Sequence, residues 1–492
     1  MRGWTFLRVL ALILAITACA SDPTRSGAAE PTGLRRQKLS LPSVSAEIVL
    51  GDPSSISDQA PAAAWGSDEY LVVWSEQATS GISIQAQRLA PDGAVVDPQP
   101  FTVSASPSSA SSGLVLASDG TSFLLFGGGG QRIFADATVE QTPLSEPVGD
   151  VAWDGATHFG VWGHSTTPGE DCFLDQAIAQ RFAPDGRSIG ASILVFDEKP
   201  CGMYMLTTVP SVAFSGRVHL VPFFSYGVVA VRVTAAGKVL DADPLVIARS
   251  GAGTPSYWPT DVAWGDEQFV VVYQSSQRAS DGSGLVDEKL LASRIDVDGN
   301  LLAPAGALFS DAGAVAGPLV VHDGSSFVAV WSERRGASAD VMAARIDAVG
   351  QVLDPGGFVV SDAPENEHVR AAASDGAGRI LVVYERARSA GDALWVRARL
   401  IGPPNTDAGV VVEPEPDSGD ALPEAAMPEA APPKAAPPVD GVGEVGGCAC
   451  EQRARVRGSH VGFGLWSALA LALMKLGRAR SRRPRWSAGS SS

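Results

Sequence analysis

The sequence predicts an all-β fold, a seven-bladed β-propeller with four strands in each blade. A unit of about 51 residues recurs seven times between residues 45 and 402, and each copy contains short apolar segments separated by turn residues. The composition agrees, because 53 glycines and 34 prolines among 492 residues favour short strands joined by turns over long helices. We expect flexible tethers and terminal signal segments on both sides of the propeller.

The first half of each copy predicts a β-hairpin. It begins with small or aromatic residues, continues with a turn of the Asp-Gly type, and ends with a strand that closes on an aromatic residue. The first copy reads AAWGSDEYLVVW from Ala63, and the fifth reads VAWGDEQFVVVY from Val262. The closing aromatic residues are expected to form the core between blades, and they are Trp74, Phe126, Trp162, Phe223, Tyr273, Trp331 and Tyr384.

The second half of each copy predicts another hairpin, marked by an arginine and, in five copies, by a glycine five residues later. A two-residue turn at Asp92-Gly93 would pair Ala90 with Val95 and place Arg88 opposite Asp97. Opposite charges that face each other stabilise a hairpin by about 0.2–1 kcal/mol. These arginines are not expected to form an anion-binding ring, because the third strands of a propeller lie outside its axis. The same spacing pairs Arg232 with Asp241 and Arg345 with Asp354.

The N-terminal segment of the repeat region is expected to close the ring. The seventh copy stops after its third strand, at Leu400. Residues 47–50 read Glu-Ile-Val-Leu and match the fourth strands of other copies, such as Phe101–Val103. This strand can therefore complete the last blade, which leaves no open sheet edge between the chain ends.

The first 19 residues have the features of an export signal: a basic start, a short apolar run and small residues around Cys19. The run is too short for a stable membrane-spanning helix. Residues 16–19, Ile-Thr-Ala-Cys, resemble a bacterial lipobox, and this resemblance implies that Cys19 is lipidated after cleavage. Residues 18–20, Ala-Cys-Ala, equally fit an ordinary signal cleavage site. Residues 20–44 are rich in polar and small residues and predict a flexible tether.

The C-terminal segments predict a linker followed by a sorting signal. Residues 403–447 are rich in proline, alanine and glutamate and are expected to remain disordered, because they hold too little apolar surface to fold. Residues 448–492 contain Cys448 and Cys450, a short apolar segment at 461–476 and a cluster of arginines. This order resembles the MYXO-CTERM sorting tail of myxobacterial surface proteins, which implies processing at the cysteine motif and removal of the helix and arginines. The alternative is a plain C-terminal anchor helix with its basic end in the cytoplasm.

The two ends together predict an exported protein, held at the outer membrane or cell surface through its terminal segments and handled by export and sorting machinery. The formal net charge is −17, and the two terminal segments are basic, so the body between them is strongly acidic. Such a body is expected to repel nucleic acid, since phosphate binding needs clustered lysine and arginine.

Cys172 and Cys201 lie in loops of the third copy that should share one face, and an exported protein is expected to join them in a disulfide. Two free thiols are the alternative.

No catalytic, metal or cofactor motif is recognisable. None of the six histidines forms a ligand-spaced pair, and no nucleophile elbow, phosphate loop or dinucleotide fingerprint occurs in a usable context. Asp296–Asn300 resembles part of a calcium loop but lacks the further ligands that such a loop needs. We therefore predict no catalytic residue, no metal and no cofactor.

Binding is expected at the axial mouth, where long loops meet the starts of the inner strands. The candidate residues are Tyr257, Trp258, Asp261, His368 and Arg370, and the alternative is that they only pack the loops.

The repeats resemble the degenerate propeller units of about 50 residues found in bacterial secreted proteins. They lack the Gly-His and Trp-Asp pairs of WD repeats and the Asp-box context of sialidases. We predict a non-enzymatic binding, adhesion or scaffold protein with an unidentified extracellular ligand, a glycan or a protein. The alternative is a secreted polysaccharide-active enzyme, a glycosidase or lyase, with convergent carboxylates at the axial mouth.

Overall fold

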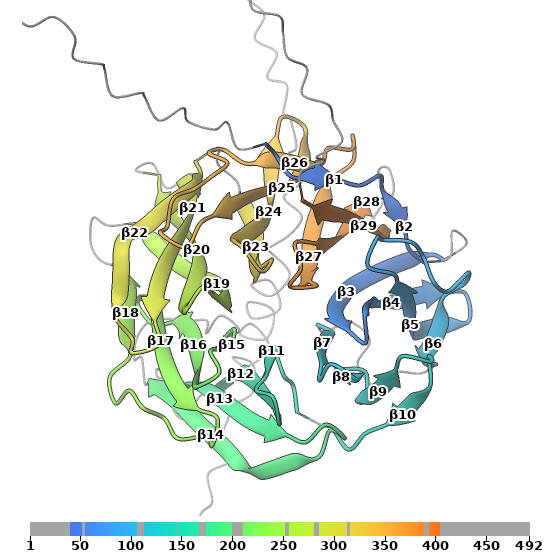
Figure 1. Ribbon diagram of the computed structural model, residues 1–492, viewed down its shortest axis with the longest axis horizontal. Helices are drawn as coiled ribbons and strands as arrows, with labels where there is room; N and C mark the ends of the chain where they lie inside the picture. The colour runs from blue at the N-terminus through green and yellow to red at the C-terminus, as the bar shows by residue number, and fades with distance from the viewer. Residues whose placement is uncertain are drawn as a thin grey trace, which may run out of the picture. The chain divides into compact units, whose positions relative to one another are not determined.

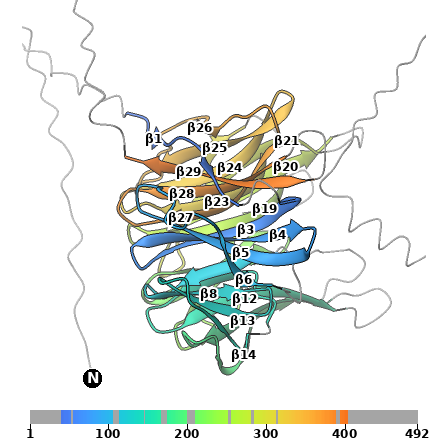
Figure 2. The same cartoon turned by 90° about the vertical axis from the view of Figure 1, so that its right-hand side faces the viewer.

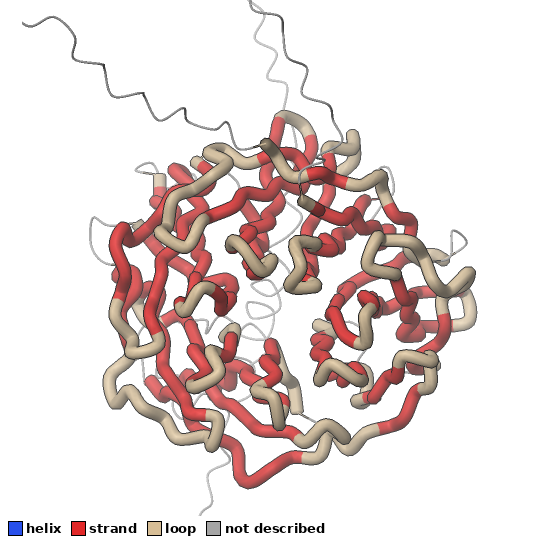
Figure 3. The backbone as a smooth tube through the Cα atoms, in the orientation of Figure 1, coloured by secondary structure: helices blue, strands red, loops and turns tan. Residues whose placement is uncertain are grey.

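Seven antiparallel sheets surround a central axis in the computed structural model of the chain (Figures 1 and 3). The predicted all-β, seven-bladed propeller with four-stranded blades is confirmed, and the described residues contain no helix. The residues that the structure describes are 40–51, 55–105, 113–144, 146–166, 174–198, 210–250, 255–279, 285–311, 315–387 and 393–403.

Each of the first six blades follows the chain order from the axis outward. The first blade contains β3 (Ser57–Gly66), β4 (Glu69–Ala78), β5 (Gly81–Leu89) and β6 (Phe101–Ser104). The second contains β7 (Val115–Ser118), β8 (Ser122–Phe126), β9 (Gln131–Phe134) and β10 (Val139–Gln141). The third contains β11 (Asp150–Trp153), β12 (His158–Thr166), β13 (Leu174–Phe182) and β14 (Ser188–Glu198).

The remaining blades repeat this order. The fourth contains β15 (Ala213–Phe214), β16 (Val218–Phe224), β17 (Gly227–Thr234) and β18 (Leu245–Arg249). The fifth contains β19 (Ser256–Gly265), β20 (Gln268–Arg278), β21 (Leu285–Asp296) and β22 (Leu301–Ser310). The sixth contains β23 (Val315–His322), β24 (Phe327–Arg335), β25 (Ser338–Ile346) and β26 (Phe358–Ser361), and the seventh contains β27 (Glu367–Ser374), β28 (Ile380–Ala387) and β29 (Leu394–Gly402).

The N-terminal strands close the ring, as predicted. In β2 (Ile48–Val49), Ile48 pairs with Ala398 of β29. A second short strand, β1 (Ser43–Val44), also pairs with β29, through Ser43 and Gly402, and lies beside it in Figure 2. Among the described residues, strand pairing is present from Ser43, close to residue 45, where the sequence placed the end of the tether.

The seven closing aromatic residues of the second strands are all buried, which confirms their predicted place in the core. Trp74, Trp331 and Tyr384 have no exposed surface. The clusters that contain them join neighbouring blades, since Tyr384 packs with residues of the sixth blade and Trp331 with residues of the fifth. Burial of these large rings therefore holds each blade against the next.

The predicted ion pairs form, but the turns that carry them are longer than expected. Arg88 donates to Asp97 from its backbone N–H at 2.9 Å and from its guanidinium at 2.5 Å. Leu89 faces Val95, and the Gly93 N–H donates to Ala90, so the turn has three residues rather than two. The positive φ of Gly93, 83°, permits this turn with its bulge and shifts the predicted register by one residue. Two further ion pairs repeat the arrangement, Arg232 with Asp241 and Arg345 with Asp354.

The predicted signal, linker and sorting segments lie outside the described residues, apart from the strand residues at the propeller boundary. Cys19, Cys172, Cys201, Cys448 and Cys450 lie outside them as well, so lipidation, processing and the disulfide stay predictions. In the described part of the chain, no helix has the length and apolar character needed to cross a membrane.

Candidate functional site

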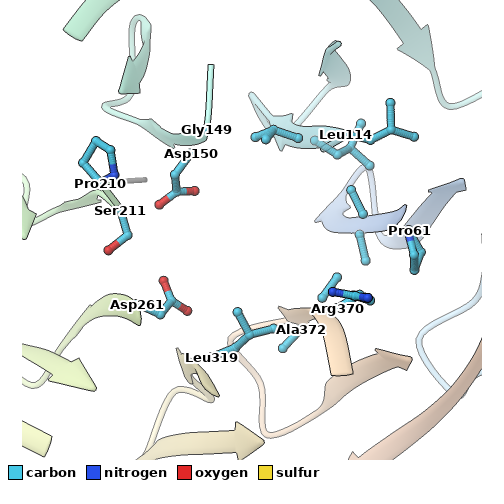
Figure 4. Close-up of a pocket in the computed structure, with 15 residues that line it drawn as sticks. Pro61, Leu114, Gly149, Asp150, Pro210, Ser211, Asp261, Leu319, Arg370 and Ala372 are labelled. Carbon is cyan, nitrogen blue, oxygen red and sulfur yellow. The ribbon is translucent and has the colours of Figure 1, made fainter. Parts of the chain in front are cut away.

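The inner strands of all seven blades meet around one cavity of about 320 Å³ on the propeller axis (Figure 4). Each blade contributes the residue from the same position of the repeat. This residue lies three places before one of the aligned inner-strand residues Trp65, Ser118, Trp153, Phe214, Trp264, His322 and Ser374. We name the seven residues at this cavity-lining position the axial ring. They are Ala62, Val115, Asp150, Ser211, Asp261, Leu319 and Ala371.

The axial ring has a polar side and an apolar side. Asp150, Ser211 and Asp261 come from the third, fourth and fifth blades, which are consecutive, and the other four blades contribute apolar residues. In Figure 4 the two carboxyl groups and the Ser211 hydroxyl lie together on one side, and Leu114 and Arg370 lie across the cavity from them. A ligand in this cavity would therefore meet polar groups at one end and apolar surface at the other.

Asp150 is fixed in place by two backbone donors. Its Oδ1 accepts a hydrogen bond from the N–H of Val151 at 2.8 Å, and its Oδ2 accepts one from the N–H of Val212 at 2.7 Å. Val212 belongs to the entry of the next blade, so the carboxyl group connects two blades. Each carboxyl oxygen still has a second lone-pair position that can face the cavity.

Asp261 repeats this arrangement two blades further on. Its Oδ1 accepts from the N–H of Val262 and its Oδ2 from the N–H of Val320 of the sixth blade, both at 2.8 Å. The same residue type at the same repeat position therefore connects the fifth blade to the sixth. Both carboxyl groups are oriented by backbone groups rather than by flexible side chains.

The surroundings of the two acids disfavour their ionised forms. Burial raises the pKa of Asp150 to about 6, although backbone hydrogen bonds from Val212 and Val151 act in the opposite direction. Burial and the neighbouring negative charge of Asp150 raise the pKa of Asp261 to about 8. The pair therefore holds a proton near neutral pH that the same residues would release in water.

These raised pKa values predict that the pair destabilises the fold as pH rises. The folded chain keeps protons that the unfolded chain releases near pH 3.8, so the contribution of the pair to the free energy of unfolding falls between about pH 4 and pH 8. The free energy of unfolding of Asp261→Asn, measured by urea unfolding, should therefore increase relative to that of the wild type as pH rises from about 5 to about 8. The exposed Asp243→Asn is the control, and a difference between Asp261→Asn and wild type that does not vary with pH would contradict the prediction.

Ser211 completes the polar side. The residue is only 6% exposed, and it lines the cavity on the same side as the two carboxyl groups (Figure 4). Among the described residues the Ser211 hydroxyl has no hydrogen-bond partner; only its backbone N–H is paired, with Pro222. A serine hydroxyl can donate one hydrogen bond and accept two, so this group can bond to a ligand in the cavity.

Arg370 lines the cavity, and its positive charge is paired with the carboxylate of Glu385. Its Nε donates to Oε2 of Glu385 at 2.8 Å, and Oε1 of Glu385 accepts from the N–H of Ala60 at 2.7 Å. The Arg370 side chain is 49% exposed, whereas that of Glu385 is 3% exposed. The balance of charge in the cavity is therefore set by Asp150 and Asp261.

The structure brings together only part of the predicted mouth. Asp261 and Arg370 line the cavity, whereas Tyr257, Trp258 and His368 are not among its lining residues. Tyr257 packs edge-on against Tyr273 with a centroid distance of 6.0 Å, Trp258 pairs with Gln274 across β19 and β20, and His368 pairs with Glu385 across β27 and β28.

Sequence reasoning missed Asp150 and Ser211. A signal for Asp150 was present, because residues 150–153 and 261–264 both read Asp-Val-Ala-Trp. Alignment of the seven copies on the inner strand places Ser211 in the same column. Comparison of this column would have shown three polar residues on consecutive blades.

No protein-family model and no curated protein matches this chain. Solved structures with a similar fold include a protein of unknown function from Dyadobacter fermentans, at 10% identity and a TM-score of 0.43, covering 74% of this chain and 100% of that one. The β-propeller domain of the Trilobed protease from Pyrococcus furiosus is 9% identical with a TM-score of 0.40, covering 70% and 95%. The polysaccharide lyase Uly1 is 8% identical with a TM-score of 0.43, covering 72% and 91%. These similarities concern the fold alone.

Proposed function

We propose that this protein is an exported, surface-held binding propeller that takes its ligand in the axial cavity without catalysing a reaction. The proposal rests chiefly on the axial ring, in which one repeat position from every blade converges on a single cavity. Three consecutive blades supply polar groups there, and one of these, the Ser211 hydroxyl, has no partner within the described residues. Ligand sites are commonly concave and mostly apolar, with a few fixed polar groups.

A ligand screen with a cavity-filling variant tests this function. Glycan and peptide arrays are probed with the wild-type protein and with Val115→Phe, which adds volume to the apolar side of the cavity. Binding by the wild type should be lost in Val115→Phe and kept in Asp243→Asn, an exposed control outside the cavity. Ligands that bind all three proteins equally would place binding elsewhere and contradict the proposal.

Surface attachment is the second part of the proposal, and it predicts processed ends. The mature protein is expected to lack at least residues 1–18, to carry lipid on Cys19, and to end near Cys448 or Cys450. Two attachments would hold the protein far better than one, because a single acyl chain binds a membrane only marginally. Intact-mass and peptide mass spectrometry of protein from membrane fractions measures this. Recovery of Met1, or of the protein in the cytoplasmic fraction, would overturn export, and recovery of Arg485 would leave the tail as a plain anchor.

A polysaccharide-active enzyme is the second candidate, and one observation favours it. Asp150 and Asp261 face the same cavity with raised pKa values, and glycosidases use such pairs of carboxyl groups as acid and base or nucleophile. Both carboxyl groups, however, also serve as connections between blades. Reducing-end release from a polysaccharide panel, lost in Asp261→Asn and kept in Asp243→Asn, would favour the enzyme over the binding protein.

A further inference from the structure

Three hydrogen-bond acceptors on consecutive blades define what the axial cavity can hold. Asp150 and Asp261 flank the blade that carries Ser211, and all three side chains come from the same repeat position. The backbone N–H groups that fix the two carboxyl groups leave their second lone-pair positions open. The Ser211 hydroxyl has no partner among the described residues. The polar side therefore offers three acceptors to one ligand group.

The charge of the cavity favours a cation. Arg370 is the other charged residue among those that line it, and its guanidinium is paired with Glu385. The two aspartates have no cationic partner among the described residues; only backbone N–H groups contact them. A bound cation would balance their charge and allow both to ionise.

The apolar side favours a cation on a hydrocarbon stem. Ala62, Val115, Leu319 and Ala371 complete the axial ring, and Leu114 lies beside them. A bare metal ion would leave this surface without a ligand. The described residues also contain no group of three His, Cys, Asp or Glu side chains that could hold a metal.

We propose that the axial cavity binds a primary alkylammonium group, with its three N–H donors on Asp150, Ser211 and Asp261 and its stem on the apolar side. An ammonium group has three donors and no acceptor, which matches three acceptors on one wall. The shared chemistry is found in free alkylamines and in lysine side chains. The inference rests on the proposed binding function and names the class of ligand for that cavity.

Calorimetric titration with defined probes tests the inference. The probes are n-butylamine, 1,5-diaminopentane, Nα-acetyl-lysine methylamide, n-butanol and butyltrimethylammonium. The three primary amines should bind, whereas n-butanol lacks the charge and butyltrimethylammonium lacks the N–H donors. Tight binding by the diamine alone points to free amines, and tight binding by the lysine derivative alone points to a lysine side chain of a protein partner. Equal binding of n-butylamine, n-butanol and butyltrimethylammonium would overturn the proposal.

Two kinds of substitution locate the binding. Asp150→Asn or Asp261→Asn should weaken n-butylamine binding by about 10-fold or more, because each removes a charge-assisted hydrogen bond. Ser211→Ala should weaken it by about 3–10-fold. Ser211→Ala removes a hydroxyl that has no partner within the described residues, so this variant should keep the fold and gives a result even if the aspartate variants do not fold. Unchanged affinity in Ser211→Ala would overturn the proposal, and Asp243→Asn serves as the matched control.

The pH dependence of binding gives an independent readout. The amine stays protonated throughout, while Asp150 and Asp261 lose their protons as pH rises. Arg370, which is paired with Glu385, is the other charged residue that lines the cavity. Affinity for n-butylamine should therefore rise between pH 5 and pH 8.5, with proton release on binding. If no amine binds but Val115→Phe still abolishes binding of a ligand from the array screen, the proposed function stands and this inference fails. If neither occurs, both fail.

Discussion

Replacement of Glu47 by alanine is expected to lower the free energy of unfolding by about 3 kcal/mol, the lower end of the cost of removing one partner of a buried ion pair. Glu47 immediately precedes the closing strand β2, and its carboxylate accepts hydrogen bonds from the hydroxyl of Tyr384 at 2.9 Å and from Arg386. It also forms an ion pair with Nε of Arg397 at 3.4 Å. The Arg386 and Arg397 side chains are 15% and 11% exposed, so the loss of Glu47 leaves two poorly hydrated cations.

Glu47→Ala should loosen the strands that close the ring more than the rest of the propeller. Glu367 still neutralises part of the charge of Arg386 in the variant, because it accepts from Arg386 Nε at 2.9 Å. Hydrogen exchange should therefore accelerate most in β1, β2 and β29, where the N-terminal strands close the ring, and urea unfolding measures the total loss. Glu140→Ala, at an exposed position of the second blade, is the control and should change stability by less than about 0.5 kcal/mol. Unchanged exchange in β29 would show that the carboxylate does not hold the closure.

The fold was predictable because its signals are local and recur. A turn and a closing aromatic residue in each copy predict its first hairpin. Residues 47–50 supply the one strand that the seventh copy lacks. The register at Gly93 was not predictable from spacing alone. A glycine with a φ of 83° is compatible with a two-residue turn and with a three-residue turn with a bulge, and the pairing of Leu89 with Val95 shows that the second forms. The ion pair between Arg88 and Asp97 forms in spite of this shift, and the carboxylate accepts hydrogen bonds from both the backbone N–H and the guanidinium of Arg88.

The site was less predictable, because it depends on convergence rather than on a local motif. Asp261 was predicted from its place near the axis, but its partner Asp150 lies 111 positions earlier and meets it only when the ring closes. Tyr257 lies on the same strand as Asp261 and yet packs against Tyr273. A bulge between Pro259 and Asp261 interrupts the alternation of faces along β19, so simple proximity in sequence misplaces the tyrosine.

The ion pair between Arg345 and Asp354 should show the largest effect of a single charge removal. Nε of Arg345 donates to Oδ2 of Asp354 at 2.8 Å and its Nη2 to Oδ1 at 2.9 Å, and its backbone N–H donates to the same carboxylate at 3.1 Å. The two side chains are 10% and 4% exposed. Hydrogen bonding by Asp354 raises the pKa of Arg345. A guanidinium stays protonated in proteins even without such a partner, so removal of the carboxylate leaves its charge unpaired. Asp354→Ala is therefore expected to cost about 3–5 kcal/mol in urea unfolding.

A double-mutant cycle separates two quantities: the net contribution of the ion pair to the free energy of unfolding, and the loss of stability caused by one buried charge without its partner. Arg345→Met keeps most of the side-chain volume, and the double variant of Arg345→Met with Asp354→Ala buries no charge at this position. The double variant should therefore be more stable than Asp354→Ala alone, since a buried ion pair is often replaceable by apolar groups. Arg217→Ala is the matched control, because Arg217 and Asp298 are 68% and 71% exposed and such pairs contribute about 0–1 kcal/mol. If the double variant were as unstable as the sum of the two single changes, the carboxylate and the guanidinium would act independently, and the unpaired buried charge would not be the cause of the loss.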